Sequence, residues 1–314
     1  MPEPEAEPIR PLSGLPGPIR VRVPAKINLH LAVGPLRDDG FHELTTVYQA
    51  ISLYDQLTAE PAPALELAVT GEGADDVPLD GSNLAARAVY ALAEATGRSP
   101  NVRLTMRKGI PVAGGMAGGS ADAAAALVAC DALWGTGLTR DELAETAAEL
   151  GSDVPFALYG GTALGTGHGE VLSPVLARTQ RHWVIALADG GLSTPTVFAE
   201  LDRLRGTGRP PPRTAGHDAL LRALRDSESA PLAKVITNDL QPAAISLRPA
   251  LRRTLAAGVE SGALGGAVSG SGPTCVFLAE DREHAIRVAA GLAGLGVCRT
   301  VRTAHGPVPG ARVI

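Results

Sequence analysis

The sequence predicts an α+β fold of two domains, and three observations lead to this class. Strand-like and helix-like segments are mixed along the chain without strict βαβ alternation, which argues against a doubly wound parallel sheet. The length of 314 residues suits one large domain or two of ordinary size. Hydrophobic residues make up 45% of the chain, enough to bury a sizeable core. We therefore expect domains at 19–180 and 181–314, after a flexible extension at 1–18 that is rich in proline and glutamate.

Composition excludes several classes of protein. The chain has 28 basic and 33 acidic residues, a net charge of −5, which disfavours nucleic acid as a partner but leaves a small anionic substrate open. No run of about 18 apolar residues predicts a membrane span, and no signal peptide is recognisable. The three cysteines (Cys130, Cys275 and Cys298) are dispersed without metal-ligand spacing, so we expect neither a disulfide framework nor a zinc site. A cytoplasmic protein without an obligate protein partner fits these features best.

The first patterned segment predicts a long β-strand. Every odd position from Val21 to Val33 is apolar, which is the period of a strand. The opposite face then carries Lys26, Asn28 and His30, each of which, taken alone, would most often be a solvated strand residue. After a turn at 38–40, extended stretches at 44–57 and 65–69 are expected to pair with this strand.

Start and stop signals place the remaining elements. Thr139 and Glu142 form a capping box before a helix that Gly151 ends. Residues 206–216 are rich in glycine and proline and predict an exposed loop. The other helices are expected at 83–97, 120–134, 218–225, 243–258 and 283–294, and the other strands at 102–106, 184–188, 275–278 and 298–303.

A glycine-rich loop at 114–120 is the most informative local feature. Its two glycine pairs permit positive φ angles and the close approach of a ligand, and an alanine-rich helix follows at once. The N-terminus of a helix offers unpaired N–H groups and a positive dipole, which favour phosphate. The loop matches neither the P-loop pattern nor a dinucleotide fingerprint, so an oxidoreductase is disfavoured. The competing interpretation is a tight packing turn before a helix.

Two further segments could contribute to a phosphate site. Asp153 follows a helix in Gly-Ser-Asp-Val-Pro-Phe, where it could cap a turn or, beside a phosphate loop, orient or deprotonate an attacking hydroxyl. Residues 269–274 read Ser-Gly-Ser-Gly-Pro-Thr and offer hydroxyls and N–H groups for a second anion contact.

Three segments together resemble the motifs of the GHMP kinase family. They are VPAKINLHL at 23–31, PVAGGMAGGSADAAAAL at 111–127 and VSGSGPTCVF at 268–277, and they occur in the family order. The resemblance covers the chain from about residue 21 to 303. It implies a two-domain kinase fold with the active site in the cleft between the domains, and ATP and Mg²⁺ as co-substrate and cofactor.

The resemblance also implies a role for each matching residue. Lys26 and Asp153 match the catalytic pair. The ATP-binding loop corresponds to Pro111, Val112, Ala113, Gly114, Gly115, Met116, Ala117, Gly118, Gly119, Ser120 and Ala121. No protein carboxylate is dedicated to Mg²⁺, so we expect phosphate and water to coordinate it, with the Ser120 hydroxyl within reach of the ion.

Segments 39–42, 151–156, 194–198 and 238–240 are similar to those of family members that phosphorylate a cytidine-diphosphate-linked polyol in the non-mevalonate route to isoprenoid precursors. The resemblance implies that His42 hydrogen-bonds cytosine, that Phe41 and Phe198 sandwich the base, and that Asn28 and Thr194 contact the rest of the substrate. Phe41 departs from the tyrosine usual in the family, which keeps the stacking ring and removes a phenol. The alternatives are a homoserine-type or mevalonate-type kinase, or a catalytically inactive nucleotide-binding regulator.

Overall fold

The computed structural model describes residues 17–112, 114–207, 210–214 and 216–314. The predicted extension therefore lies outside the described residues except for its last two, as do Ala113 and part of the loop at 206–216. The strands are β1 (Ile19–Leu36), β2 (His42–Pro61), β3 (Glu66–Gly71), β4 (Val102–Lys108), β5 (Thr162–Thr166), β6 (Val171–Pro174), β7 (Arg181–Leu187), β8 (Thr237–Asn238), β9 (Gly265–Val268), β10 (Cys275–Ala279), β11 (Thr300–Gly306) and β12 (Arg312–Val313). The helices are α1 (Leu84–Thr96), α2 (Gly118–Trp134), α3 (Arg140–Leu150), α4 (Val154–Tyr159), α5 (Thr194–Arg205), α6 (Asp218–Arg225), α7 (Ala230–Ala233), α8 (Gln241–Leu247), α9 (Ala250–Glu260) and α10 (Arg282–Gly294), with a 3₁₀ turn at Ala74–Asp76.

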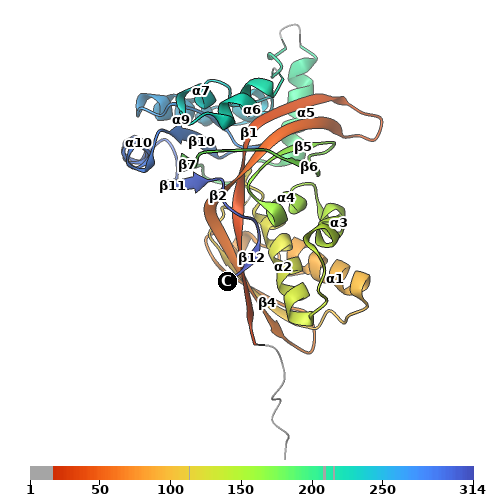
Figure 1. The fold of residues 1–314 in the computed structure, drawn as a ribbon. Coiled ribbons are helices and arrows are strands. Elements are labelled where there is room, and N and C mark those ends of the chain that lie inside the picture. The colour runs from red at the N-terminus through yellow and green to blue at the C-terminus, as the bar shows by residue number, and fades with distance from the viewer. Residues whose placement is uncertain (1–16, 113, 208–209, 215) are drawn as a thin grey trace, which may run out of the picture.

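Two sheets organise the chain, and the predicted α+β class is confirmed (Figure 1). The larger sheet has the order β12-β1-β2-β4-β3, with β5 and β6 continuing from β2 and β8 pairing with β1. The smaller sheet has the order β11-β7-β10-β9. Because β8 and β12 belong to the larger sheet, the C-terminal part of the chain contributes to both sheets. The boundary between residues 180 and 181 stays a prediction.

The long hairpin of β1 and β2 spans both parts of the molecule (Figure 1). The odd apolar positions from Val21 to Leu29 lie fully buried in the main core together with α1 and α2. Leu31 and Val33, further along the same strand, pack into a second core with the smaller sheet. The even positions that carry Lys26, Asn28 and His30 are buried as well, so this face is not the solvated face typical of such residues. A strand that is buried on both faces can present polar side chains to a cleft.

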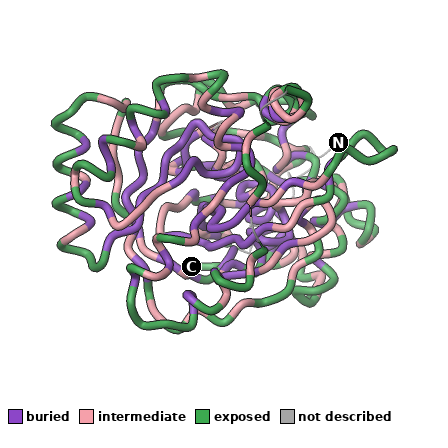
Figure 2. Tube along the Cα trace, turned by 90° about the horizontal axis from the view of Figure 1, so that it is seen from above, coloured by how far each residue is buried: buried purple, intermediate pink, exposed green. Residues whose placement is uncertain are grey.

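Helix α2 is the central helix of the main core, where Figure 2 shows the buried segments gathered inside an exposed periphery. Its alanine run leaves the helix with almost no polar face, a composition typical of a fully surrounded helix. The predicted alanine-rich helix is present, but it begins at Gly118, two residues before the expected start at residue 120, so the second glycine pair belongs to its first turn. The predicted capping box of α3 is also confirmed, since the Thr139 and Glu142 side chains bond reciprocally to the backbone.

Two further expectations were wrong in detail, and two short helices were not predicted. The stretch at 65–69 forms β3, but it pairs parallel with β4 and not with the first strand, because α1 supplies the crossover that parallel neighbours need. The helix expected at 243–258 is two helices, α8 and α9, which break at Arg248 and Pro249 since a proline disfavours helical geometry in the residue before it. The short helices α4 and α7 are too brief to show a helical period in the sequence.

Because His30 is buried, we expect the protein to lose stability in acid. Its side chain is buried beside His217 and Thr237, and its Nε2 has no hydrogen-bond partner among the described residues. Burial lowers the pKa of His30 to about 4, with His217 adding to the effect and Asp239 opposing it. The unfolded chain, with a His pKa of about 6.5, binds the proton more readily, so this contribution is complete above pH 6.5 and is lost as the pH falls towards 4.

We expect the wild-type protein to lose about 3 kcal/mol of unfolding free energy through His30 between pH 7 and pH 4. Denaturant titrations at several pH values, with His30→Asn as the comparison, measure this contribution. The variant should show a shallower dependence on pH in this range. Parallel curves for the two proteins would contradict the assignment.

Within the described ranges, no helix combines the length and the apolar composition needed to cross a bilayer.

Candidate active site

A cavity of about 850 Å³ collects most of the residues that the sequence singles out. Its walls come from β1, β2, the start of α2, the turn before α4, the start of α5 and the loop after β9. The predicted site residues in its lining are Lys26, Asn28, Phe41, His42, Gly114, Gly115, Ala117, Gly118, Gly119, Asp153, Thr194 and Phe198. Elements from both sheets therefore meet at one hollow.

Lys26 and Asp153 form an ion pair in this cavity, with 3.4 Å between Nζ and Oδ2. Asp153 is the residue before α4, but its side chain does not cap that helix, so the carboxylate is free to face the cavity. The Lys26 ammonium also donates to Asn28 Oδ1 at 3.0 Å, and the Asn28 amide in turn donates to Thr46 Oγ1 at 2.8 Å. Period-two spacing on β1 thus brings the lysine and the asparagine to one face, as the sequence predicts.

Tyr48 is a neighbour of this pair that the sequence analysis missed. It lies on β2 directly opposite Asn28, and its ring is 5.2 Å from the Lys26 ammonium. Burial raises the pKa of Tyr48 well above its usual value, and the Asp153 carboxylate adds to this rise. The phenol therefore stays protonated beside Asp153. Only the register of β1 against β2, which a single sequence does not specify, could have revealed it.

The glycine-rich loop lines the cavity beside this ion pair. Gly115 has a φ of +75° and Ala117, the residue before α2, has a φ of +57°. Helix α2 begins directly after Ala117, and its first two residues, Gly118 and Gly119, lie in the cavity lining. The N-terminus of a helix, with its unpaired N–H groups, therefore borders the cavity. A side chain on Gly115 would collide with the backbone carbonyl of Ser269, so this glycine is required both for its φ angle and for close packing.

The other members of the predicted ATP-binding segment support the loop from behind. Pro111, Met116 and Ala121 are buried, Val112 and Ser120 are partly buried, and none of these five belongs to the cavity lining. Ala113 lies outside the described residues. The Met116 carbonyl accepts a hydrogen bond from the Lys26 backbone N–H at 3.3 Å, which ties the loop to β1.

The loop at 269–274 packs directly against the glycine-rich loop. Ser269 Oγ donates to the Gly115 carbonyl at 3.2 Å. A side chain on Gly270 would come within 3.3 Å of Asn28 Oδ1 and 3.6 Å of Lys26 Nζ. Ser271 faces the cavity from this loop and shares a hydrogen bond of 3.0 Å with Thr194 at the start of α5. The second glycine-rich segment thus completes one wall of the same site.

The far end of the cavity is lined by aromatic rings. The His42 and Phe198 ring centroids are 5.2 Å apart, and His42 Nε2 lies 2.9 Å from Asp202 Oδ1. Phe41 is exposed and stacks on His168 with 4.9 Å between centroids. Sequence analysis missed Asp202 and His168, although Asp202 stands one helical turn after Phe198, a spacing that puts both on one face of α5.

Residues 83–161 match the GHMP kinases N terminal domain, and residues 220–297 match the GHMP kinases C terminal domain. These two matches and the full-length relatives described next place the chain in the GHMP kinase family, to which it belongs. Membership of this kinase family makes ATP the co-substrate.

Relatives of high identity carry one name. A protein of Salinispora tropica called 4-diphosphocytidyl-2-C-methyl-D-erythritol kinase is 65% identical over 301 residues, which is 96% of each chain. One of Nocardia farcinica with the same name is 63% identical over 96% of this chain and 98% of its own. A crystal structure of 4-(cytidine 5'-diphospho)-2C-methyl-D-erythritol kinase is 34% identical, with a TM-score of 0.72 over 91% of this chain and 98% of that chain. A homoserine kinase from Cytophaga hutchinsonii, 18% identical with a TM-score of 0.76 over 98% of this chain and 100% of that chain, shares the fold.

Proposed function

We propose that this protein transfers the γ-phosphoryl group of ATP to the 2-hydroxyl of 4-diphosphocytidyl-2-C-methyl-D-erythritol, in the non-mevalonate route to isoprenoid precursors. The observation that carries the proposal is that one cavity is lined by the Lys26–Asp153 ion pair, a phosphate-type loop and a group of aromatic side chains. The names of the relatives at 57–65% identity support the same acceptor.

Transfer proceeds in line, without a covalent enzyme intermediate. The acceptor oxygen attacks the γ-phosphorus while Asp153 takes up the hydroxyl proton, and ADP leaves. Lys26, paired with Asp153, places a positive charge beside the phosphoryl group as negative charge spreads over its oxygens. The N–H groups of Gly118 and Gly119, at the N-terminus of α2, hold the ATP phosphates.

The aromatic end of the cavity binds the cytosine ring. Phe41 and Phe198 stack on the base, and His42 hydrogen-bonds its edge, with Asp202 fixing the orientation of the imidazole. Asn28 and Thr194 contact the diphosphate and polyol that lead from the base to the ion pair.

The proposal includes Mg²⁺ as the ion that accompanies the ATP phosphates. Among the described residues, no three His, Cys, Asp or Glu side chains are close enough together to hold a metal ion. We propose that phosphate and water oxygens mainly hold the ion. Ser120, near the start of α2, lies outside the cavity lining, so a contact from its hydroxyl to the ion stays a prediction. When bound, such an ion neutralises charge on the ATP phosphates.

We infer further that the protein works in the cytoplasm and needs no obligate protein partner. All three cysteines are free, and Cys130 and Cys275 are buried, which suits a reducing compartment. Burial raises the pKa of both thiols to about 12, so neither is a reactive thiolate.

A panel of acceptors tests the proposed substrate. Purified protein with Mg·ATP is incubated with the cytidylated polyol, homoserine or mevalonate, and release of ADP is followed. Turnover is expected with the cytidylated acceptor alone, because only this acceptor can fill the aromatic end of the cavity. Phosphorylation of homoserine or mevalonate would overturn the assignment, and ATP binding without turnover of any acceptor would favour the inactive regulator.

A further inference from the structure

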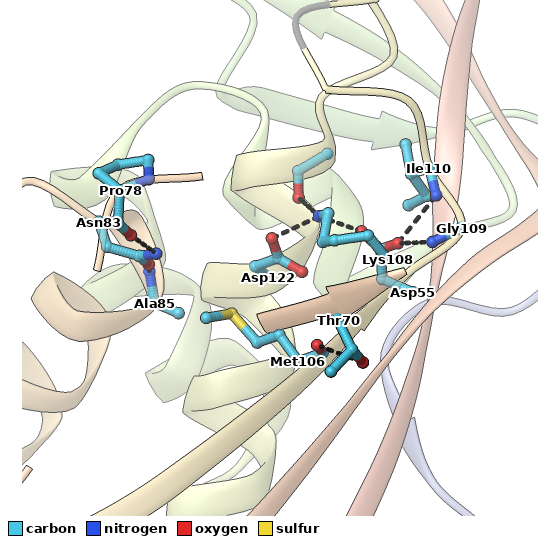
Figure 3. A network of polar contacts seen from close by, with 11 residues as sticks. Asp55, Thr70, Pro78, Asn83, Ala85, Met106, Lys108, Gly109, Ile110 and Asp122 are labelled. Carbon is cyan, nitrogen blue, oxygen red and sulfur yellow. Dashed lines mark hydrogen bonds and ion pairs between the residues drawn. The ribbon is translucent and has the colours of Figure 1, made fainter. Parts of the chain in front are cut away.

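A buried ionic cluster lies directly behind the phosphate loop, outside the cavity lining. Its members are Asp55 on β2, Lys108 at the end of β4 and Asp122 on α2, which we call the loop clamp. All three side chains are at least 95% buried. Figure 3 shows the Lys108 ammonium between the two carboxylates. None of the three belongs to the cavity lining.

The loop clamp holds both ends of the segment that carries the phosphate-binding N–H groups. At its start, Asp55 Oδ1 accepts hydrogen bonds from the backbone N–H groups of Gly109 (2.6 Å) and Ile110 (2.8 Å). At its end, the Lys108 ammonium donates to the Gly118 carbonyl at 3.4 Å, and it also contacts Asp122 one turn into α2. The end of the segment is thus bonded to the Lys108 ammonium directly, and the start is bonded to it through Asp55.

The charges of the cluster make it costly to bury. Two carboxylates share one ammonium, and burial raises the pKa of Asp122 despite the attraction of Lys108. The Oδ1 atom of Asp122 has no hydrogen-bond partner among the described residues. Apolar residues of similar volume would stabilise a core at least as well as such a cluster, so stability alone does not account for it. A buried polar network can instead specify one conformation.

The conformation that needs such support is that of the loop. Ala117 has a positive φ, which is unfavourable for a residue with a side chain, and it sits immediately before Gly118. A strained backbone persists only where the surrounding structure imposes it. Gly118 and Gly119, whose N–H groups have no acceptor within the helix, follow this residue directly and lie in the cavity lining.

We propose that Asp55, Lys108 and Asp122 are positioning residues that hold the phosphate loop in its ATP-binding geometry, so that their loss weakens nucleotide binding selectively and leaves acceptor binding unaffected. This inference rests on the proposed kinase function, in which the loop at 114–119 binds ATP. The acceptor subsite, formed by Phe41, His42 and Phe198, shares only strand β2 with the clamp, where His42 and Asp55 lie 13 residues apart. No hydrogen bond joins the two groups in the described network.

Asp122→Asn tests the clamp, because it keeps the shape of the side chain and removes the charge that holds Lys108. We expect the KM for ATP and the Kd for Mg·ADP to rise about tenfold, as for a small misplacement of binding groups. The KM for the acceptor should stay within about twofold of the wild-type value, as expected for an independent site. Asp131→Asn, the same change at the far end of the same helix, is the matched control and should leave all three constants unchanged.

A fall in melting temperature with unchanged ATP and ADP constants would make the clamp a purely structural feature and overturn the proposal. An equal rise in the constants for both substrates would overturn it too. Calorimetric titration with Mg·ADP needs no acceptor, so the clamp is tested even if the proposed acceptor fails.

If Asp122→Asn does not fold, amide hydrogen exchange on the unliganded wild-type protein tests whether the loop clamp holds the loop. The amides of Gly109 and Ile110, bonded to Asp55, should exchange as slowly as those of β4. Fast exchange at these two positions would show that the clamp does not hold the loop.

Discussion

Replacing Asp153 with asparagine is expected to lower kcat by a factor of about 10²–10⁴, the range for loss of a general base or of charge stabilisation. The amide keeps the shape of the side chain but cannot take up the proton of the attacking hydroxyl. KM values should change far less, because the loop and the aromatic subsite remain intact. Lys26→Ala should lower kcat over the same range, since Asp153 then faces the phosphoryl group without its cation.

Steady-state kinetics with the cytidylated acceptor measure both variants. Asp141→Asn is a suitable control, because this carboxylate bonds the Tyr159 phenol on the surface and lies outside the cavity. Combining the two active-site changes should cost little more than either alone, as expected for residues that act as one unit. Near-wild-type turnover in both single variants would rule out the ion pair as the catalytic centre.

Replacing Trp183 with alanine is expected to lower the free energy of unfolding by about 3–5 kcal/mol, the usual cost of truncating a buried tryptophan. Trp183 lies on β7 of the smaller sheet and is fully buried, and its indole N–H donates to Gln49 Oε1 on β2 at 2.9 Å. The residue therefore ties the two sheets that form the cavity. The alanine variant leaves a void and an unpaired buried amide oxygen.

Trp183→Phe separates these two effects. The phenyl ring refills most of the void, so the remaining loss should be about 1–3 kcal/mol from the Gln49 oxygen left without its donor. Chemical denaturation followed by circular dichroism gives both values. A loss below 1 kcal/mol for the alanine variant would contradict the role of Trp183 between the sheets.

The parts of the fold with strong local signals could be predicted from the sequence. The alternation in β1 predicts which side chains share a face, and the Thr139–Glu142 spacing predicts the start of α3. The pairing of β3 with β4 could not be predicted, because strand partners depend on a crossover and not on local residues. The short helix α4 also escaped prediction, although its start positions Asp153.

In the candidate site, too, local signals could be predicted from the sequence and long-range contacts could not. Spacing and residue type within a single segment are enough to predict Lys26, Asn28 and the glycine-rich loop as site residues. Tyr48 lies at the cavity because of the register of β1 against β2, and His168 because it stacks on Phe41. Neither feature can be predicted from a single sequence. The two glycines of the pair Gly114–Gly115 have different roles. Only Gly115 has a positive φ, while a side chain on Gly114 would come within 3.1 Å of Thr274 Oγ1.

A crystal structure of the protein with a non-hydrolysable ATP analogue and the cytidylated acceptor tests the proposed reaction most directly. It should place the acceptor 2-hydroxyl about 2.6–3.2 Å from an Asp153 carboxylate oxygen, in line with the γ-phosphorus. The cytosine ring should lie between Phe41 and Phe198, with the triphosphate at the N-terminus of α2. An acceptor whose hydroxyl lies out of reach of Asp153, or a base bound away from His42, would contradict the proposed mechanism.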